Sequence, residues 1–558
     1  MNPNASVFVP GMKFGAKPSA TPAPAATAAT PAAAANSTPV VEEPKVVVQE
    51  EKKVEKKPAP VAAAPVETTT TTSTTSTSAT SPTTTVTSPT TDDDVDELGN
   101  KIDDVVIQDV SNFKEDQREH LNIVFIGHVD AGKSTISGNI MLLTGQVDSH
   151  TMAKYEREAK ENHRESWIFA YIMDTNEEER AKGKTVEVGR AHFETEKKRY
   201  TILDAPGHKA YVPNMISGAA QADVAILVIS SKKGEFEAGV DGGQTIEHAR
   251  LAKMIGIKHL IVLVNKMDEP TVAWSKERYD DIVEKITGHL KKCGFNPKKD
   301  FQFIPASGFT SANIKDRVKP EVCPWFDGDS LMGTLDALAP FERNDSGALR
   351  VPIITSYKDR GVVTVMGKIE SGTITLGQSL WLMPGRTPVQ VASLSNETCN
   401  FRTGRTGENL RIGLKGIDED TIRAGSILSE IQRPVPVVSE IEAIVALIDL
   451  PKEKQLFTSN FEAVFHAHTA VEECIVKSLV ATIDMKTGQE IKKKPTFAKN
   501  GESVKCRIVL NRAVCLEEFT TNPQLSRFTL RDSNKTMAFG KVTSIGKKAR
   551  EAINSPKA

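Results

Sequence analysis

The chain has 558 residues, a length sufficient for about three to five domains of ~100–200 residues each. Its formal net charge is -2, and 39% of its residues are hydrophobic. The balanced charge does not indicate nucleic-acid or membrane binding, and no run approaches the ~18 apolar residues of a membrane span. The N-terminus has no signal-peptide pattern. The cysteines form no CxxC pair or metal-ligand cluster, which favours reduced thiols in a cytoplasmic protein; they are Cys293, Cys323, Cys399, Cys474, Cys506 and Cys515.

Residues 1–119 are predicted to be a disordered tail. Ala/Pro repeats occupy residues 16–39, a charged stretch follows at 40–57, and a Thr/Ser tract covers 67–91. Such compositions bury too little apolar surface to offset the entropy cost of ordering the backbone. Residues 92–119 are strongly acidic, and we interpret them as a solvated linker.

Strand and helix patterns alternate over residues 120–345, which predicts a doubly wound α/β domain. Helical patterns at 246–255 and 279–290 separate runs that are apolar on both faces, as expected of buried parallel strands. These runs are Leu121–Ile126, Tyr200–Leu203, Val224–Ile229, Leu260–Val264 and Phe301–Ile304.

The pattern changes after about Leu349. Short alternating runs such as Val362–Ile369 are separated by glycine turns, and no long helical pattern returns. We therefore predict two antiparallel β-barrels, at residues 346–435 and 436–558.

The strongest motif follows the first predicted strand and opens a helix, the context required of a phosphate loop. Glycines let backbone amides wrap the phosphates, and the helix offers its positive N-terminus. Lys133 should reach the β- and γ-phosphates, and Ser134 should ligate magnesium. The residues assigned to nucleotide binding here are Gly127, His128, Val129, Asp130, Ala131, Gly132, Lys133, Ser134 and Thr135.

A second motif, Asp204, Ala205, Pro206, Gly207 and His208, follows the strand Tyr200–Leu203. A carboxylate at this strand end can hold a magnesium-bound water, and Gly207 can give its amide to the γ-phosphate. Because hydrolysis removes that phosphate, the segment is predicted to act as a switch. The alternative is an ordinary Asp-Pro-Gly type turn.

A third motif, Asn265, Lys266, Met267 and Asp268, follows the strand Leu260–Val264. The Asp268 carboxylate can accept hydrogens from N1 and the 2-amino group of guanine, a donor pair that adenine lacks. Asn265 would brace the base and the phosphate loop, and the Lys266 stem would cover the ring. Taken alone, the tetrapeptide also suits a helix N-cap or turn. A weaker signal follows the strand Phe301–Ile304, where backbone amides are predicted to support the base; its residues are Ser307, Gly308 and Phe309.

The metal and the attacking water complete the predicted site. Magnesium is assigned to Ser134, Thr185 and, through a water, Asp204; Thr175 competes with Thr185, which lies closer to the strand expected to pair with Tyr200–Leu203. His208 is predicted to be the catalytic residue that orients the water. Neutral imidazole and imidazolium both remain open for it.

These motifs resemble those of the translational GTPases, the family of elongation factor Tu. Further stretches are similar to the GTP-binding subunits of eukaryotic peptide chain release factors (release factor three); they are Tyr155–Lys160, Arg164–Trp167, Gly183–Arg190, Gly234–Glu237, Phe465–Thr469 and Arg527–Asp532. The resemblance covers residues 121–545. Ile246 and Ser526 depart from it, standing where the family usually has Arg and Gly.

The resemblance implies a GTPase domain followed by two β-barrels. It implies that the last barrel binds the class-one release factor, and that ribosome-stimulated GTP hydrolysis lets that partner reach the peptidyl-transferase centre. The partner, and not this chain, would cleave peptidyl-tRNA. A ribosome-rescue GTPase, elongation factor one alpha and a nucleotide-independent scaffold are the alternatives, and the intact motifs argue against the scaffold.

The first ten residues resemble a short peptide that docks into the C-terminal domain of poly(A)-binding protein. Asn2, Ala5, Phe8 and Pro10 fall at the family spacing, with Met1 where Leu is usual. Phe8 would fill a pocket of the partner. The alternative is a chance match in a frayed terminus.

Overall fold

The computed structural model describes residues 118–163, 167–174, 179–180, 185–240, 242–359, 361–396, 399–451, 453–484, 487–532 and 535–546. Thr175 and most of the predicted tail, including Asn2, Ala5, Phe8 and Pro10, lie outside the described residues. The first strand begins at Glu119, shortly before the predicted Leu121. Glu119 is in register with Lys198 and forms a 3.2 Å ion pair with its Nζ, which extends the strand.

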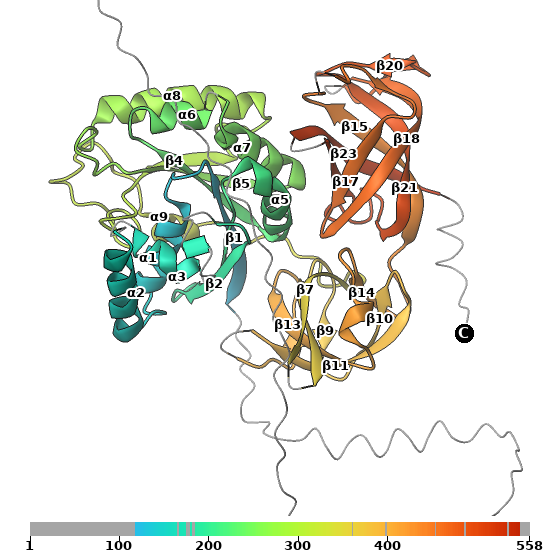
Figure 1. The fold of residues 1–558 in the computed structure, drawn as a ribbon, viewed down its shortest axis with the longest axis horizontal. Helices are drawn as coiled ribbons and strands as arrows, with labels where there is room; N and C mark the ends of the chain where they lie inside the picture. Colours follow the sequence, from blue (N-terminus) through green and yellow to red (C-terminus); the bar gives the residue numbers. More distant parts are fainter. Residues whose placement is uncertain are drawn as a thin grey trace, which may run out of the picture. The chain divides into compact units, whose positions relative to one another are not determined.

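In the described ranges, six strands form one sheet in the order β2-β3-β1-β4-β5-β6 (Figure 1). The neighbours pair in parallel except β2, which is antiparallel to β3. All five predicted apolar runs are strands of this sheet. The strands are β1 (Glu119–Gly127), β2 (Gly189–Glu194), β3 (Lys198–Asp204), β4 (Val224–Ser230), β5 (His259–Asn265) and β6 (Phe301–Pro305).

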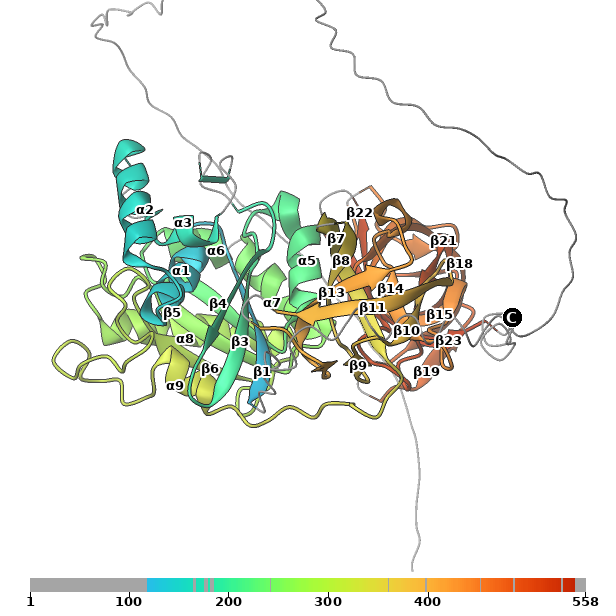
Figure 2. The same cartoon turned by 90° about the horizontal axis from the view of Figure 1, so that it is seen from below.

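Helices cover both faces of the sheet because its strands are apolar on both sides (Figures 1 and 2). Successive residues of β1 show this: Ile123 and Phe125 join one core, whereas Val124 and Ile126 join the other. The first core includes α1 (Lys133–Leu143), α3 (Ala170–Met173) and α9 (Leu331–Asp336), and the second includes α5 (Val212–Gln221), α7 (Gln244–Ile255) and α8 (Lys276–Lys292). Other helices of the described part are α2 (Ser149–Glu161), α6 (Glu235–Val240), η3 (Lys209–Tyr211) and η4 (Glu419–Thr421).

The next strands close into an antiparallel barrel in the order β10-β11-β13-β8-β7-β14. Its alternating strands point residues such as Val351, Val365 and Ile412 into one core. The strands are β7 (Arg350–Asp359), β8 (Val362–Lys368), β10 (Ser379–Met383), β11 (Thr387–Ser395), β13 (Asn409–Lys415) and β14 (Ile427–Glu430), and a small ribbon pairs β9 (Ile374–Thr375) with β12 (Thr403–Gly404).

A second antiparallel barrel follows in the order β17-β22-β23-β15-β21-β18, closed by pairing of β18 with β17. The α/β domain and two barrels confirm the predicted fold class. The strands are β15 (Val437–Leu447), β17 (Glu462–Ala467), β18 (Ala470–Ile483), β21 (Ser503–Cys515), β22 (Arg527–Asp532) and β23 (Lys535–Ile545), with β19 (Glu490–Lys493) added at β18 and a ribbon of β16 (Phe457–Thr458) and β20 (Phe497–Ala498). None of the helices in the described ranges has the length and apolar character that crossing a membrane requires.

A buried carboxylate joins the sheet to the first barrel. Asp223, just before β4, accepts hydrogen bonds from Asn122 and forms ion pairs with Arg343 (3.0 Å) and with Lys368 of β8 (3.1 Å). Burial acts to raise the pKa of Asp223, but Lys368 and Arg343 outweigh burial and hold that pKa well below its usual range. Both cations share this anion, and Lys368 also pairs with Glu370 at 3.6 Å.

Replacing the shared anion should destabilise the protein strongly. Asp223→Ala leaves two mostly buried cations without a common partner, which is expected to cost about 3–5 kcal/mol. The matched control is Asp280→Ala, which removes the partner of Lys276 at the surface of α8 and should cost less than about 1 kcal/mol. Urea unfolding followed by circular dichroism measures both, and equal shifts in the midpoints would contradict the assignment.

Candidate functional site: a nucleotide pocket at the carboxyl ends of the strands

The phosphate loop connects β1 to α1 by a path that requires glycine. Gly127 has a φ of 144° and Gly132 a φ of 96°, in the region that side chains disfavour. A Cβ on Gly127 would overlap the carbonyl oxygen of Val228, and one on Gly132 would overlap the amide of Asn265. No side chain caps the N-terminus of α1, so its first amides are open to an anion.

Lys133 lies between the phosphate loop and the segment that follows β3. Its Nζ donates to the carbonyl oxygen of His128 at 2.8 Å. A Cβ on Gly207 would meet Lys133 Nζ at 2.5 Å and the amide of Val129 at 2.9 Å, so the two segments are in close contact. Burial lowers the pKa of Lys133 in spite of nearby carboxylates. A bound phosphate would supply the negative charge needed to compensate this buried ammonium.

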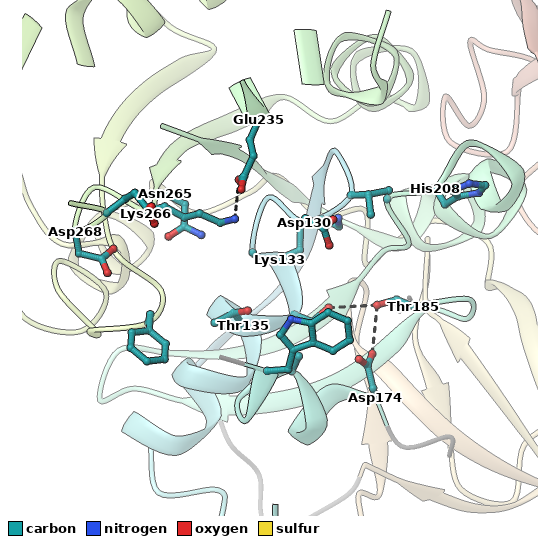
Figure 3. A pocket seen from close by; sticks show the side chains of 18 of the residues that line it. Asp130, Lys133, Thr135, Asp174, Thr185, His208, Glu235, Asn265, Lys266 and Asp268 are labelled. Atoms are coloured by element: carbon teal, nitrogen blue, oxygen red, sulfur yellow. Dashed lines mark hydrogen bonds and ion pairs between the residues drawn. The ribbon is translucent and has the colours of Figure 1, made fainter. Parts of the chain in front are cut away.

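Hydroxyls and carboxylates gather below the loop (Figure 3). Thr185 Oγ1 lies 3.2 Å from Ser134 Oγ and donates to Asp174 Oδ1 at 3.2 Å. Asp204 is fully buried, and neither of its carboxylate oxygens has a hydrogen-bond partner among the described residues. Burial raises the pKa of Asp204 to about 6.

This group of residues fits a magnesium ion. Burial, followed by the charge of Asp204, raises the pKa of Asp174 to about 7, so both carboxylates lie where a compensating cation is needed. Hydroxyl and carboxylate oxygens are the donors that Mg²⁺ prefers. The contact of Thr185 with Ser134 also brings the threonine favoured by the sequence to the phosphate loop, across 51 positions.

Asn265 connects the two ends of the pocket. Its Nδ2 donates to the carbonyl oxygen of Ala131 at 2.9 Å, and its Oδ1 accepts from the amide of Gly308 at 2.8 Å. Asn139 of α1 donates to the carbonyl oxygen of Gly308 at 2.7 Å, which fixes the same loop from its other side. The phosphate loop and the loop after β6 are therefore held at a set distance.

His208 lies at the start of the short helix η3. Its Nδ1 accepts from the amide of Ala210 at 3.2 Å, and its ring lies 5.7 Å from that of Tyr211. With Nδ1 acting as an acceptor, the neutral ring carries its proton on Nε2. The nitrogen left for a ligand is then a donor.

These parts enclose a cavity of about 680 Å³ (Figure 3). Most predicted site residues line it: Val129, Asp130, Gly132, Lys133, Ser134, Thr135, Thr185, Gly207, His208, Asn265, Lys266, Asp268 and Phe309. The cavity lining does not include the other predicted residues, which are Gly127, His128, Ala131, Asp204, Ala205, Pro206, Met267, Ser307 and Gly308.

Sequence reasoning did not assign several residues of this site. The cavity is also lined by Trp167, Ala170, Asp174, Glu235, Glu269 and Pro270. His248 of α7 supports the loop from behind: its Nδ1 accepts from the amide of Gly127 at 3.2 Å, and burial lowers the pKa of His248 to about 3, which keeps that nitrogen an acceptor. Trp167 and Glu235 lie in stretches of the family resemblance, Glu269 and Pro270 follow the third motif, and Asp174 lies next to Thr175, but none of these signals assigned a role to the residue.

Comparison with known families matches three parts of the chain. Residues 118–343 match the elongation factor Tu GTP binding domain, residues 363–429 match elongation factor Tu domain 2, and residues 440–543 match the GTP-eEF1A C-terminal domain-like family.

Similar proteins cover most of the chain. A eukaryotic peptide chain release factor GTP-binding subunit of Dictyostelium discoideum is 71% identical over 461 residues, covering 82% of this chain and 82% of the relative. The Kluyveromyces lactis protein of the same name is 48% identical over 453 residues, covering 81% of this chain and 64% of the relative.

Solved structures share the fold. The GTPase-like domain of S. cerevisiae Ski7 aligns with a TM-score of 0.63 at 19% identity, covering 76% of this chain and 97% of that chain. The elongation factor SelB of Methanococcus maripaludis, with a GTP analogue, aligns with a TM-score of 0.55 at 18% identity, covering 78% and 81%. At these identities the likeness extends to the fold alone.

Asp268 gives a test of base recognition. In Asp268→Asn the acceptor pair becomes a donor and an acceptor, so GTP affinity should fall by roughly 100-fold and preference should shift towards xanthosine triphosphate. Competition binding with the two nucleotides measures the shift. Asp280→Asn, at the surface of α8, is the matched control and should bind GTP normally. Equal GTP affinity in Asp268→Asn and the unmodified chain would reject the assignment.

Proposed function

This chain belongs to the GTP-binding subunits of eukaryotic peptide chain release factors, within the elongation factor Tu family. From this membership we propose which of its residues bind the nucleotide, which act in hydrolysis and which contact the partners. It is a GTP hydrolase of translation termination that binds GTP and GDP. We propose that residues 120–345 carry the hydrolytic site, and that the barrels at 346–435 and 436–558 carry the contacts with its partners.

The phosphate end of the site would neutralise the charge of the nucleotide. Lys133 and the open amides at the start of α1 would hold the β- and γ-phosphates. Ser134, Thr185 and, through a water, Asp204 would hold Mg²⁺, which supplies positive charge beside these phosphates when bound. The single observation that carries this proposal is the contact of Thr185 with Ser134 and Asp174.

The same geometry suggests how hydrolysis becomes a signal. Thr185 precedes β2 and Gly207 follows β3, and both would be held by contacts to the γ-phosphate or its metal. Loss of that phosphate removes the shared anchor, so both segments would be released together. We propose that this release is what the barrels transmit to the partner.

His208 would position the attacking water. Because Nδ1 accepts from Ala210, the neutral ring would present an Nε2 proton to the water or to a phosphate oxygen. The catalytic contribution would then be orientation and charge stabilisation, which is the main demand of phosphoryl transfer. An imidazolium would present the same Nε2 donor but could not accept from the Ala210 amide at Nδ1.

The proposed partners follow from the family. The class-one release factor would bind mainly at the last barrel, on the ribosome in the cytoplasm, and that factor would cleave peptidyl-tRNA. We also propose that Asn2, Ala5, Phe8 and Pro10 dock into poly(A)-binding protein, through a segment whose one aromatic residue would be the anchor.

Removal of the His208 ring tests the catalytic proposal. His208→Ala should keep GTP binding but slow ribosome-stimulated hydrolysis by about two to four orders of magnitude, because the water loses its positioning group. Single-turnover hydrolysis on ribosomes measures the rate. His289→Ala, on α8 and away from the cavity, should hydrolyse GTP at the normal rate. An unchanged rate in His208→Ala would remove this residue from the mechanism.

Recovery of the partner tests the biological role. The full chain, loaded with GTP and magnesium, should retain the class-one release factor from cytosol. Recovery of its ribosome-rescue relative instead would favour the rescue function, and recovery of aminoacyl-tRNA would favour an elongation function. A chain that binds no guanine nucleotide would overturn the proposal as a whole.

A further inference from the structure

The segment Gly234–Glu237 is part of the family resemblance, but nothing above gives it a task. It follows β4 and begins helix α6, and Glu235 is its only member that lines the nucleotide cavity. Figure 3 shows the Glu235 carboxylate pointing to the Lys266 ammonium. Helix α6 therefore reaches the part of the pocket where the third motif lies.

The contact between these two side chains is close. Glu235 Oε2 accepts from Lys266 Nζ at 2.7 Å and from Ser230 Oγ at 2.8 Å, so the carboxylate is itself held in place. Lys232 Nζ lies 3.6 Å from Oε1, the other oxygen of the carboxylate. Lys266 then lowers the pKa of Glu235 against the effect of burial, which keeps the carboxylate charged.

The backbone of Lys266 is fixed independently of its side chain. Its φ is 62°, and its carbonyl oxygen accepts from Ser231 Oγ at 2.9 Å. The side chain leaves this fixed point between Asn265 and Asp268, and its exposed fraction is 29%. Four rotatable bonds would otherwise let the ammonium move freely in water, so holding the stem in one position has an entropy cost.

We propose that Glu235 is a positioning residue for guanine nucleotide binding. By holding the ammonium of Lys266, it keeps the four-carbon stem of that lysine flat against the cavity wall, where it covers one face of the base. Glu235 acts through Lys266 and is not a catalytic residue. The inference rests on the proposed assignment of the base to the end of the pocket at Asp268.

The geometry gives this role a distinct signature. The base is common to GTP and GDP, and the phosphates lie at the other end of the pocket around Lys133. Loss of Glu235 should therefore weaken GTP and GDP to the same extent. The effect should appear in KM and leave kcat alone, because binding is affected equally in the ground and transition states.

The first experiment compares two glutamates of one helix. Glu235→Gln should weaken both GTP and GDP by about two- to fivefold, the range of a partly exposed ion pair. Glu237→Gln is the matched control: Glu237 also lies in the first turn of α6 and pairs with Arg278 at 3.1 Å, but it does not line the cavity. Equilibrium titration with fluorescent GTP and GDP in magnesium measures each affinity, and Glu237→Gln should match the unmodified chain.

The second experiment asks whether Glu235 acts through Lys266. In a Lys266→Met background, adding Glu235→Gln should change neither affinity further, because the ammonium to be held is absent. An equal loss with and without Lys266, or a loss confined to GTP, would overturn the inference.

The two hypotheses can fail separately. If the unmodified chain binds both nucleotides and Glu235→Gln binds them equally well, the positioning role alone is wrong. If the unmodified chain binds neither nucleotide, the proposed function is wrong before Glu235 is considered.

Discussion

The nucleotide pocket depends on one buried amide. Asn265 donates to the phosphate loop at Ala131 and accepts from the loop after β6 at Gly308, and it has no room to do otherwise because Gly132 packs directly against it. Each bond satisfies a backbone group that would be costly to leave unpaired in the interior. Asn265, at the end of β5, thus bonds both the phosphate end and the base end of the cavity, and Asn139 holds the base-end loop from its other side.

The parallel sheet makes this arrangement possible. Its strands are buried on both faces, so their alternating residues hold two layers of helices, and the loops at their carboxyl ends come together at one edge. Glycines at Gly127, Gly132 and Gly207 then let the backbone approach neighbours that any larger residue would strike. Packing on the faces and contact at the edge are separate requirements, met by separate residues.

Local patterns were sufficient for five strands of the sheet, for α7 and α8, and for the loops that carry the three motifs. The run Leu121–Ile126 became β1 with an extended start because Glu119 pairs with Lys198 across strands. The run 279–290 became α8, which begins earlier, at Lys276, because the Ser275 side chain caps its N-terminus. Patterns could not supply contacts made across long stretches of chain. Asp174 and Glu235 reach the cavity through tertiary packing. The hydrogen bond between His248 and Gly127 spans 121 positions, and no spacing in the sequence predicts it.

The cluster around Asp223 lies at the amino end of β4, whereas the nucleotide loops follow the carboxyl ends of β1, β3 and β5. Attachment of the barrel and handling of the phosphate therefore occupy opposite margins of the same strands. The length of the strands thus separates the ion pairs that fasten the first barrel from the loops that contact the nucleotide.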